Sequence, residues 1–356
     1  MVIAVVLFAG FELIVRFGFP QTRNTTYIGE KSLGQRDKIV GHINQPNAHA
    51  LITSPEFDVE YVVNEQGFRD TSLYSPNKPA GVTRVLLLGD SFTFGSGNDY
   101  ADIWPVLIEN QLRDKGHQIE VIKAGVPGYD THKEVLYMER LYEELQPDIV
   151  IFTFLPNDLF TNTPILEASN EPAQKRDDGI RNKGDKKSVL HSVTLIKRML
   201  MSNDTLYERL YLMTGRRAYF STEPGDEVLK QYEETEKLLS RANRFCKDKN
   251  CEFMVLSIPQ QFQVLAIARG ESPEGIDPTF IDTRLESFAQ NEGFEWISLL
   301  PGLAKAYNER DEDLYYRFDG HLNKSGNEVA AQIISNALES TLARPGAQSN
   351  SSLTTQ

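Results

Sequence analysis

The sequence predicts an α/β fold built on a parallel β-sheet that carries helices on both sides. Five short apolar runs indicate buried strands, and longer stretches with apolar residues at helical spacing separate them. Such alternation is typical of parallel sheets, because each crossover helix covers one face of the sheet. The expected strands cover residues 84–88, 119–122, 148–154, 252–258 and 294–299. The expected helices cover residues 104–112, 131–145, 229–248, 280–292 and 324–342, the last with Asn323 as its N-cap.

The first strand leads into Gly89-Asp90-Ser91, where a strand gives way to a loop and then to a helix. Open α/β folds bind their ligands at this carboxyl edge of the sheet. A serine at this point can present its hydroxyl to a crevice, while its N–H lies near a helix N-terminus, where negative charge is favoured. An acyl-transfer nucleophile needs both features. Taken alone, the segment is equally compatible with a Ser/Gly turn before a helix.

Three further polar segments follow later strands or lie in a late loop. They are the segment of Gly125 and Gly128, the pair Asn157-Asp158, and the triplet Asp319-Gly320-His321. The order Ser, Gly, Asn and His resembles that of the SGNH (GDSL-type) hydrolase family, over roughly residues 82–340 and most closely its membrane-anchored bacterial members. This resemblance implies a flavodoxin-like, three-layer α/β/α sandwich with a five-stranded parallel sheet.

The resemblance also implies a role for one or more residues of each segment. Ser91 is expected to be the nucleophile and His321 its base, because imidazole titrates near working pH. Asp319 is expected to hold the second ring nitrogen and to stabilise the imidazolium. The implied oxyanion donors are the backbone N–H groups of Ser91 and Gly125 and the side-chain amide of Asn157.

The acid is the member of this triad whose spacing departs from the family pattern. Many members place two residues between the acid and the histidine, whereas Gly320 alone separates Asp319 from His321. Gly320 can supply the backbone freedom that the shorter spacing needs. Asp313 and Asp311, just upstream, are the alternative acids.

The remaining polar candidates are interpreted mainly as structural. Asp90 and Asp158 are expected to hydrogen-bond loop N–H groups, with a tuning of charge in the cleft as the alternative. Among the other histidines, His132 is kept as a possible cleft residue. The sequence has no His/Cys cluster, no metalloprotease helix and no phosphate-binding glycine loop, so we expect neither a metal nor a cofactor.

Charge and cysteine content restrict the partners and the compartment. The net charge of the 356 residues is −13 without a Lys/Arg block, so nucleic acid is not an expected partner. Cys246 and Cys251, the only cysteines, are too few for a zinc site. They could form a small-loop disulfide in an exported protein or remain reduced thiols.

Residues 1–15 are almost wholly apolar, apart from Glu12, and Arg16 follows at a helical spacing that would let the two pair. The run is at the short end for a membrane span. Three interpretations of residues 1–20 stay open: an uncleaved signal-anchor, a cleaved signal peptide, or a buried helix. We expect the catalytic domain outside the cytoplasm, anchored at the inner membrane or released to the periplasm if the N-terminus is cleaved.

The rest of the chain is expected to hold one catalytic domain with accessory segments. The domain covers residues 82–342 and contains an insertion at 159–228, interpreted as a lid or as a solvated insertion with a packed helix. Before it, residues 21–81 form an accessory segment, in which the alternation at 57–63 predicts one half-exposed strand of a hairpin. Residues 343–356 are small and polar and predict a disordered tail.

Three functions are compatible with these features. The first is a serine esterase that removes an acyl group, expected to be acetyl, from a carbohydrate or another small ester. The second is an O-acetyltransferase that uses the same triad to modify an envelope polysaccharide. The third is a catalytically silent carbohydrate-binding or scaffold protein that has kept the fold.

Overall fold

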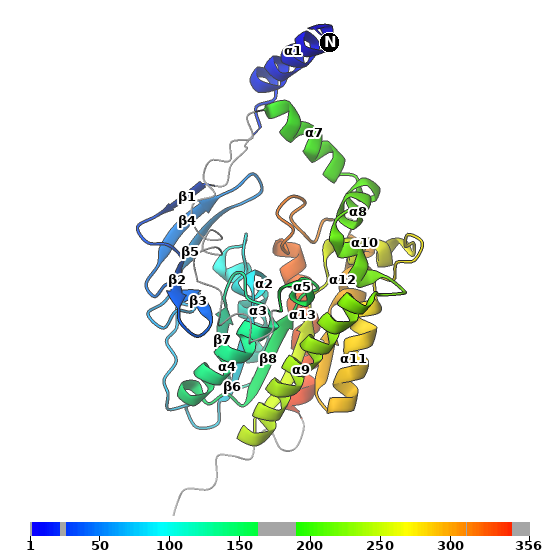
Figure 1. Cartoon of the computed structure of the whole chain (residues 1–356). Helices are drawn as coiled ribbons and strands as arrows, with labels where there is room; N and C mark the ends of the chain where they lie inside the picture. Colours follow the sequence, from blue (N-terminus) through cyan, green and yellow to red (C-terminus); the bar gives the residue numbers. More distant parts are fainter. Residues whose placement is uncertain (1, 22–25, 163–189, 311, 344–356) are drawn as a thin grey trace, which may run out of the picture.

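A five-stranded parallel sheet, in the order β10-β9-β8-β6-β7, forms the centre of the protein. We describe it from a computed structural model, which covers residues 2–21, 26–162, 190–310 and 312–343 (Figure 1). The strands are β6 (Thr83–Gly89), β7 (Ile119–Gly125), β8 (Ile149–Phe154), β9 (Glu252–Ser257) and β10 (Glu295–Ser298). Each coincides with a strand expected from the sequence, and the predicted fold class is confirmed.

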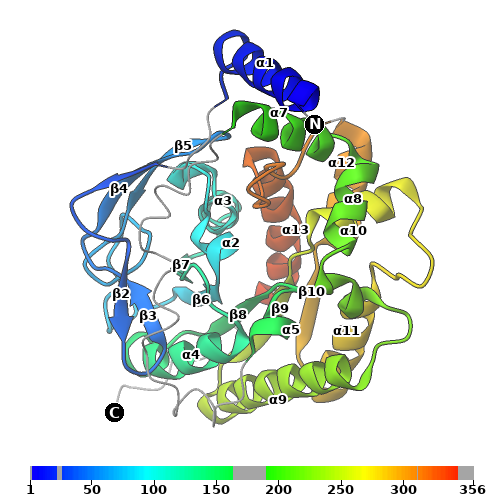
Figure 2. The same cartoon turned by 45° about the horizontal axis from the view of Figure 1, so that its top comes forward.

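Helices cover both faces of this sheet and complete three layers (Figure 2). On one face lie α4 (Thr131–Leu145), α9 (Asp226–Lys249) and α11 (Phe280–Glu292). On the other lie α3 (Trp104–Asp114), α12 (Leu300–Arg310) and α13 (Lys324–Leu342). Along β6, Leu86 and Leu88 pack into the first layer, whereas Val85 and Leu87 pack into the second. Burial on both faces is why this strand is a continuous apolar run.

Two helices of the core were not expected from the sequence. They are α10 (Gln261–Arg269) and α12, which pack against each other. Pro301 and Gly302 lie in the first turn of α12. A helix tolerates a proline in its first turn, but a Pro-Gly pair in a sequence is usually interpreted as a turn, so the helix was not expected.

Small antiparallel sheets of the accessory segment lie beside the β7 edge of the central sheet (Figure 1). One contains β1 (Thr26–Gly29), β4 (His49–Thr53) and β5 (Asp58–Val62), and the other is the hairpin of β2 (Gly34–Asp37) and β3 (Gly41–Asn44). Strand β5 matches the strand predicted at 57–63, and its residues alternate between exposed and buried. Its hairpin partner is the preceding strand, β4.

A buried ionic cluster joins the accessory segment to strand β7. The Lys123 ammonium donates to Asp70 (2.8 Å) and to Glu109 of α3 (2.6 Å), and the Tyr74 hydroxyl donates to the Val121 carbonyl (2.7 Å). Breaking a buried pair of this kind from one side typically costs about 3–5 kcal/mol. The accessory segment is therefore integrated with the sheet by polar as well as apolar contacts.

The N-terminal helix α1 (Val2–Gly18) projects from the body and contacts α7 (His191–Met201), which continues to α8 (Asp204–Leu212) (Figure 1). Glu12 and Arg16 form the expected ion pair, at 3.0 Å. None of the helices in the described part of the chain is both long and apolar enough to cross a membrane.

Parts of two further predictions fall outside the described residues. The insertion interpreted as a lid, 159–228, includes residues 163–189, which are not described, and its described part after them contains the helices α7 and α8. The predicted tail likewise lies outside, apart from its first residue. Cys246 and Cys251 are described and are buried, free thiols, which agrees with the second of their two interpretations.

Candidate active site

Ser91 is the first residue of α2 (Ser91–Phe94), immediately beyond strand β6. Asp90 caps this short helix by accepting the Phe92 N–H at 2.8 Å, as expected for a turn-fixing aspartate. Gly95 ends the helix in the left-handed conformation, with φ of +77°. Burial raises the pKa of Asp90 to about 6. Strand β6 and the two caps of α2 together hold Ser91 at the carboxyl edge of the sheet, where it is half-buried.

The three expected triad residues form one hydrogen-bonded chain. The Ser91 hydroxyl donates to His321 Nε2 at 2.7 Å, and His321 Nδ1 donates to the Asp319 carboxylate. Asp319 and His321 lie in a tight turn closed by hydrogen bonds from the Tyr316 N–H to the His321 carbonyl and from the Gly320 N–H to the Tyr316 carbonyl, both at 2.8 Å. Gly320 has φ of +88°, which accommodates the short spacing between acid and base.

Of the two alternative acids, only Asp313 is described, and it binds Arg317 and not His321. Asp311 lies outside the described residues. Burial lowers the pKa of His321, but the hydrogen bond and the charge of Asp319 outweigh it, with a further contribution from Asp90, so that the pKa is raised. The imidazolium is thus stabilised by the carboxylate that orients the ring.

Gly125 ends strand β7 with its peptide groups turned away from Ser91. The Val126 N–H donates to the Gly89 carbonyl at 2.9 Å, so the trans peptide directs the Gly125 carbonyl to the opposite side, where it accepts from the Asn44 amide at 2.9 Å. Because N–H and C=O of one strand residue point the same way, the Gly125 N–H also faces the accessory segment. This geometry does not support the expectation that the Gly125 N–H is an oxyanion donor.

Gly128, three residues further, lies in a turn that orients its N–H differently. The Tyr129 N–H donates to the Val126 carbonyl at 3.1 Å, and Gly128 occupies the third position of the turn with φ of +84°, after Pro127. This is the pattern of a type II turn. His42 Nε2 donates to the Pro127 carbonyl at 2.8 Å, which turns the Gly128 N–H of the same peptide away from His42.

Asn157 is the N-cap residue of α5 (Asp158–Thr161), after strand β8, but its side chain makes no capping hydrogen bond. Among the described residues the side-chain amide nitrogen also has no hydrogen-bond acceptor, so it is available for another one. Its neighbour Asp158 is buried and accepts from the Thr131 hydroxyl at 3.3 Å, in line with a structural role. Burial and the charge of Asp90 raise the pKa of the Asp158 carboxyl.

His132, the possible cleft residue, is buried in the first turn of α4. Burial lowers the pKa of its imidazole. The side chain does not contact the triad.

Arg69, which sequence reasoning missed, holds the segment that follows the nucleophile. Its guanidinium is fully buried and donates to the carbonyls of Phe94 (2.9 Å), Gly95 (2.7 Å) and Asn98 (2.6 Å). It also stacks on the Tyr61 ring, 4.4 Å from the centroid. The carbonyls at the end of a short helix need donors, and Arg69 supplies them from the accessory segment. A lone arginine between two weak strand patterns gave no sequence signal for this contact.

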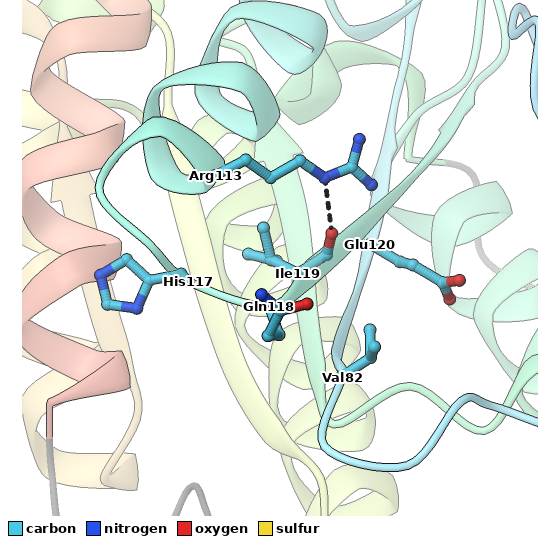
Figure 3. Close-up of a pocket in the computed structure, with 6 residues that line it drawn as sticks. All are labelled: Val82, Arg113, His117, Gln118, Ile119 and Glu120. Atoms are coloured by element: carbon cyan, nitrogen blue, oxygen red, sulfur yellow. Dashed lines mark hydrogen bonds between the residues drawn. The ribbon is translucent and has the colours of Figure 1, made fainter.

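A separate pocket lies at the amino ends of β6 and β7, and Figure 3 shows the residues that line it, whereas Ser91 follows the carboxyl end of β6. Its lining includes Arg113, whose Nε donates to the Ile119 carbonyl at 3.0 Å, together with His117 and Glu120. It contains no serine or cysteine nucleophile. Across the described ranges, no group of three His, Cys, Asp or Glu side chains is arranged to hold a metal ion.

A serine that is hydrogen-bonded to a histidine, at the carboxyl edge of an α/β/α sandwich, is the arrangement expected of a serine hydrolase. The sequence model of the GDSL-like Lipase/Acylhydrolase family matches residues 87–329, and the chain belongs to this family. The protein is accordingly an SGNH-type esterase, an enzyme that hydrolyses ester bonds.

Individual relatives are distant. An arylesterase of Vibrio mimicus is 28% identical over 75 residues, which are 21% of this chain and 38% of that protein. The solved acetyl xylan esterase AlAXEase is 16% identical, with a TM-score of 0.45, over 72% of this chain and 99% of that one. The psychrotrophic esterase EstA from Pseudoalteromonas sp. is 11% identical, with a TM-score of 0.44, over 74% and 100% of the two chains.

Proposed function

We propose that the esterase acts through a Ser91–His321–Asp319 triad and an acyl-enzyme. The observation that carries this proposal is the 2.7 Å hydrogen bond between Ser91 Oγ and His321 Nε2. His321 takes the proton as Ser91 Oγ attacks the ester carbonyl, and then gives it to the departing alcohol. Water, deprotonated by the same imidazole, attacks the acyl-enzyme, the bond between the acyl carbon and Ser91 Oγ breaks, and the imidazolium returns the proton to Ser91 Oγ as the acid leaves. Asp319 stabilises the imidazolium in both steps.

The donors proposed for the oxyanion are the Ser91 N–H, the Gly128 N–H and the Asn157 side-chain amide. Gly128 replaces Gly125 in this set because of the peptide orientations described above. Within the described residues, none of these three donors has a hydrogen-bond partner. Each follows a different strand at the same edge of the sheet, where a substrate carbonyl next to Ser91 would meet them.

The proposed substrate is a small acyl ester, expected to be acetyl, of a carbohydrate or another polar alcohol. The turn that carries the triad acid has a polar border, where Arg317 forms ion pairs with Asp204 of α8 and with Asp313. Such a border favours a hydrophilic alcohol group. The contact of α8, a described part of the expected insertion, with this turn also supports a lid role for α8.

Replacing Ser91 by alanine tests the proposal. We expect Ser91→Ala to lose hydrolysis of p-nitrophenyl acetate and labelling by a serine-directed fluorophosphonate, with an unchanged melting temperature. Ser287→Ala, on the exposed face of α11, is the matched control and should behave as wild type. Labelling of Ser91→Ala at the wild-type rate would refute the nucleophile. Product analysis with an oligosaccharide acceptor separates hydrolysis from acetyl transfer.

We further propose that α1 attaches the enzyme to the inner membrane, with the catalytic domain outside the cytoplasm. The exposed large apolar side chains of this helix are Ile3, Val5, Val6, Leu7, Phe8, Phe11, Leu13, Ile14 and Phe17. They occupy several faces of the helix, which a lipid phase covers more readily than a single protein groove.

Glu12 is the acidic residue of α1, and a charged side chain weakens a membrane role for this helix. Partners within the protein compensate its negative charge. Its carboxylate pairs with Arg16 and accepts the N–H groups of His191 (3.0 Å) and Ser192 (2.8 Å) at the N-terminus of α7. A helix N-terminus favours such a negative charge.

Cell fractionation combined with protease treatment of spheroplasts tests the location. We expect the full chain in the membrane fraction and accessible to protease, and a variant lacking residues 1–20 in the soluble fraction. Full-length protein that is soluble and protected from protease would contradict the proposal.

A further inference from the structure

We propose that Glu56 of the accessory segment is a positioning residue for Asp319, so that the active site is completed from outside the family domain. This inference rests on the proposed triad. It assigns a catalytic contribution to a segment that precedes the region matched by the family model, which begins at residue 87.

Glu56 lies at the tip of the hairpin between β4 and β5. The tip is a tight turn, because the Ser54 hydroxyl oxygen accepts the N–H groups of Glu56 (3.1 Å) and Phe57 (3.0 Å). The Ser54 N–H in turn donates to the Phe57 carbonyl at 2.7 Å. The glutamate is thus presented on a fixed backbone.

The Glu56 carboxylate binds the backbone of the catalytic acid directly. It accepts the Asp319 N–H at 2.8 Å and the Phe318 N–H at 3.1 and 3.2 Å from its two oxygens. Two successive amides directed at one carboxylate fix the peptide planes on both sides of the Phe318 Cα, and the second plane includes the Asp319 nitrogen. The backbone from which the Asp319 side chain leaves is thereby held on its N-terminal side.

A ring contact joins the hairpin tip to the turn that carries Asp319, beside this carboxylate. Phe57 packs against Tyr316, with ring centroids 5.2 Å apart. The Tyr316 hydroxyl donates to the Gly97 carbonyl at 2.8 Å, in the segment that follows the nucleophile helix. The accessory hairpin, the triad turn and the nucleophile segment therefore form one contact network.

The short acid–base spacing explains why this turn needs an external support. One residue, a glycine in the left-handed conformation, separates Asp319 from His321. The turn's own backbone hydrogen bonds involve Tyr316, Gly320 and His321 but not the Asp319 N–H, which Glu56 accepts instead. The Asp319 side chain is also 32% exposed, and among the described residues its carboxylate accepts a side-chain hydrogen bond only from His321. Glu56 places a second carboxylate beside Asp319, and the two negative charges repel each other. The hydrogen bonds that Glu56 accepts from the backbone oppose this repulsion.

The test compares Glu56→Ala and Glu56→Gln with Glu60→Ala in the full-length protein. Glu60 lies on strand β5 of the same hairpin, pairs with exposed His49 and does not contact the triad turn. We expect Glu56→Ala to lower kcat for p-nitrophenyl acetate by about 10- to 100-fold with KM changed by less than about threefold, the scale of a misplacement of about 1 Å. Glu56→Gln, which keeps one acceptor oxygen, should lie between, and Glu60→Ala should match wild type.

A double-mutant cycle separates positioning of Asp319 from a general loss of structure. If Glu56 acts through Asp319, Glu56→Ala should lower kcat by less than about threefold in an Asp319→Asn background. An equal loss in both backgrounds, or wild-type kcat in a folded Glu56→Ala protein, would overturn the inference. Should the alanine variant fail to fold, the same cycle with Glu56→Gln decides.

Fluorophosphonate labelling of the wild-type protein tests the proposed function itself. A wild-type protein that is not labelled refutes the triad. A wild-type protein that is labelled, with equal kcat for Glu56→Ala and Glu60→Ala, refutes the role of Glu56 alone.

Discussion

Gly125→Ala distinguishes two reasons why a glycine follows strand β7. The sequence suggested that Gly125 offers its backbone N–H to the substrate, and an alanine keeps that N–H. The structure indicates instead that the position has no room for a side chain. A Cβ on Gly125 would lie 2.4 Å from the nitrogen of Phe94 and 2.6 Å from the carbonyl carbon of Thr93.

The size of this overlap sets the expected effect. Ordinary carbon contacts begin near 3.5 Å, so the backbone of α2 would have to move by about 1 Å. Overpacking of this kind typically costs about 1–3 kcal/mol of stability. Because Ser91 begins the helix that must move, its Oγ would shift relative to His321 by a similar distance. A misplacement of about 1 Å corresponds to a loss of about 100-fold in kcat/KM.

The measurement is kcat/KM for p-nitrophenyl acetate together with the melting temperature. Gly225→Ala is the control, because Gly225 has an ordinary φ of −72° and no atom within 4 Å of the added Cβ. We expect a large loss of activity for Gly125→Ala and none for Gly225→Ala. Wild-type activity in Gly125→Ala would refute the steric argument and would leave a role for the Gly125 N–H as the better explanation.

Three further predictions concern the triad and its support. Because His321 must be unprotonated to act as base and its pKa is raised, kcat/KM should rise with pH through an ionisation above about 6.5; a midpoint below that value would contradict the assignment. Asp319→Asn removes the main cause that raises this pKa, so the midpoint should move to lower pH while kcat falls on the order of 10³-fold or more. Asp313→Asn should keep near-normal kcat, and the opposite ranking of these two variants would make Asp313 the acid. Arg69→Met leaves three carbonyls without their charged donor and should lower the free energy of unfolding by about 3–5 kcal/mol, measured by urea denaturation; a change below about 1 kcal/mol would contradict the role given to Arg69.

Much of the fold could be predicted because it depends on local patterns. The five strands are apolar runs buried on both faces, and α4, α11 and α13 begin and end where their periodicity does. Helix α12 was missed because Pro301 and Gly302 begin it. The accessory segment was predicted only in part, since short antiparallel strands depend on their partners more than on their own composition.

The sequence by itself determined the order of the strands along the chain and predicted the serine, asparagine, aspartate and histidine of the proposed site. These residues follow strand ends, and parallel strands bring their carboxyl ends to one edge whatever the loops between them contain. The tertiary structure alone decided how the peptide planes near the candidate site are oriented, because a peptide plane is oriented by its long-range partners: Asn44 binds the Gly125 carbonyl, and His42 binds the Pro127 carbonyl of the peptide that carries the Gly128 N–H. It also decided the contacts of Arg69 and Glu56, whose side chains bind backbone atoms that are distant in sequence and leave no local pattern there.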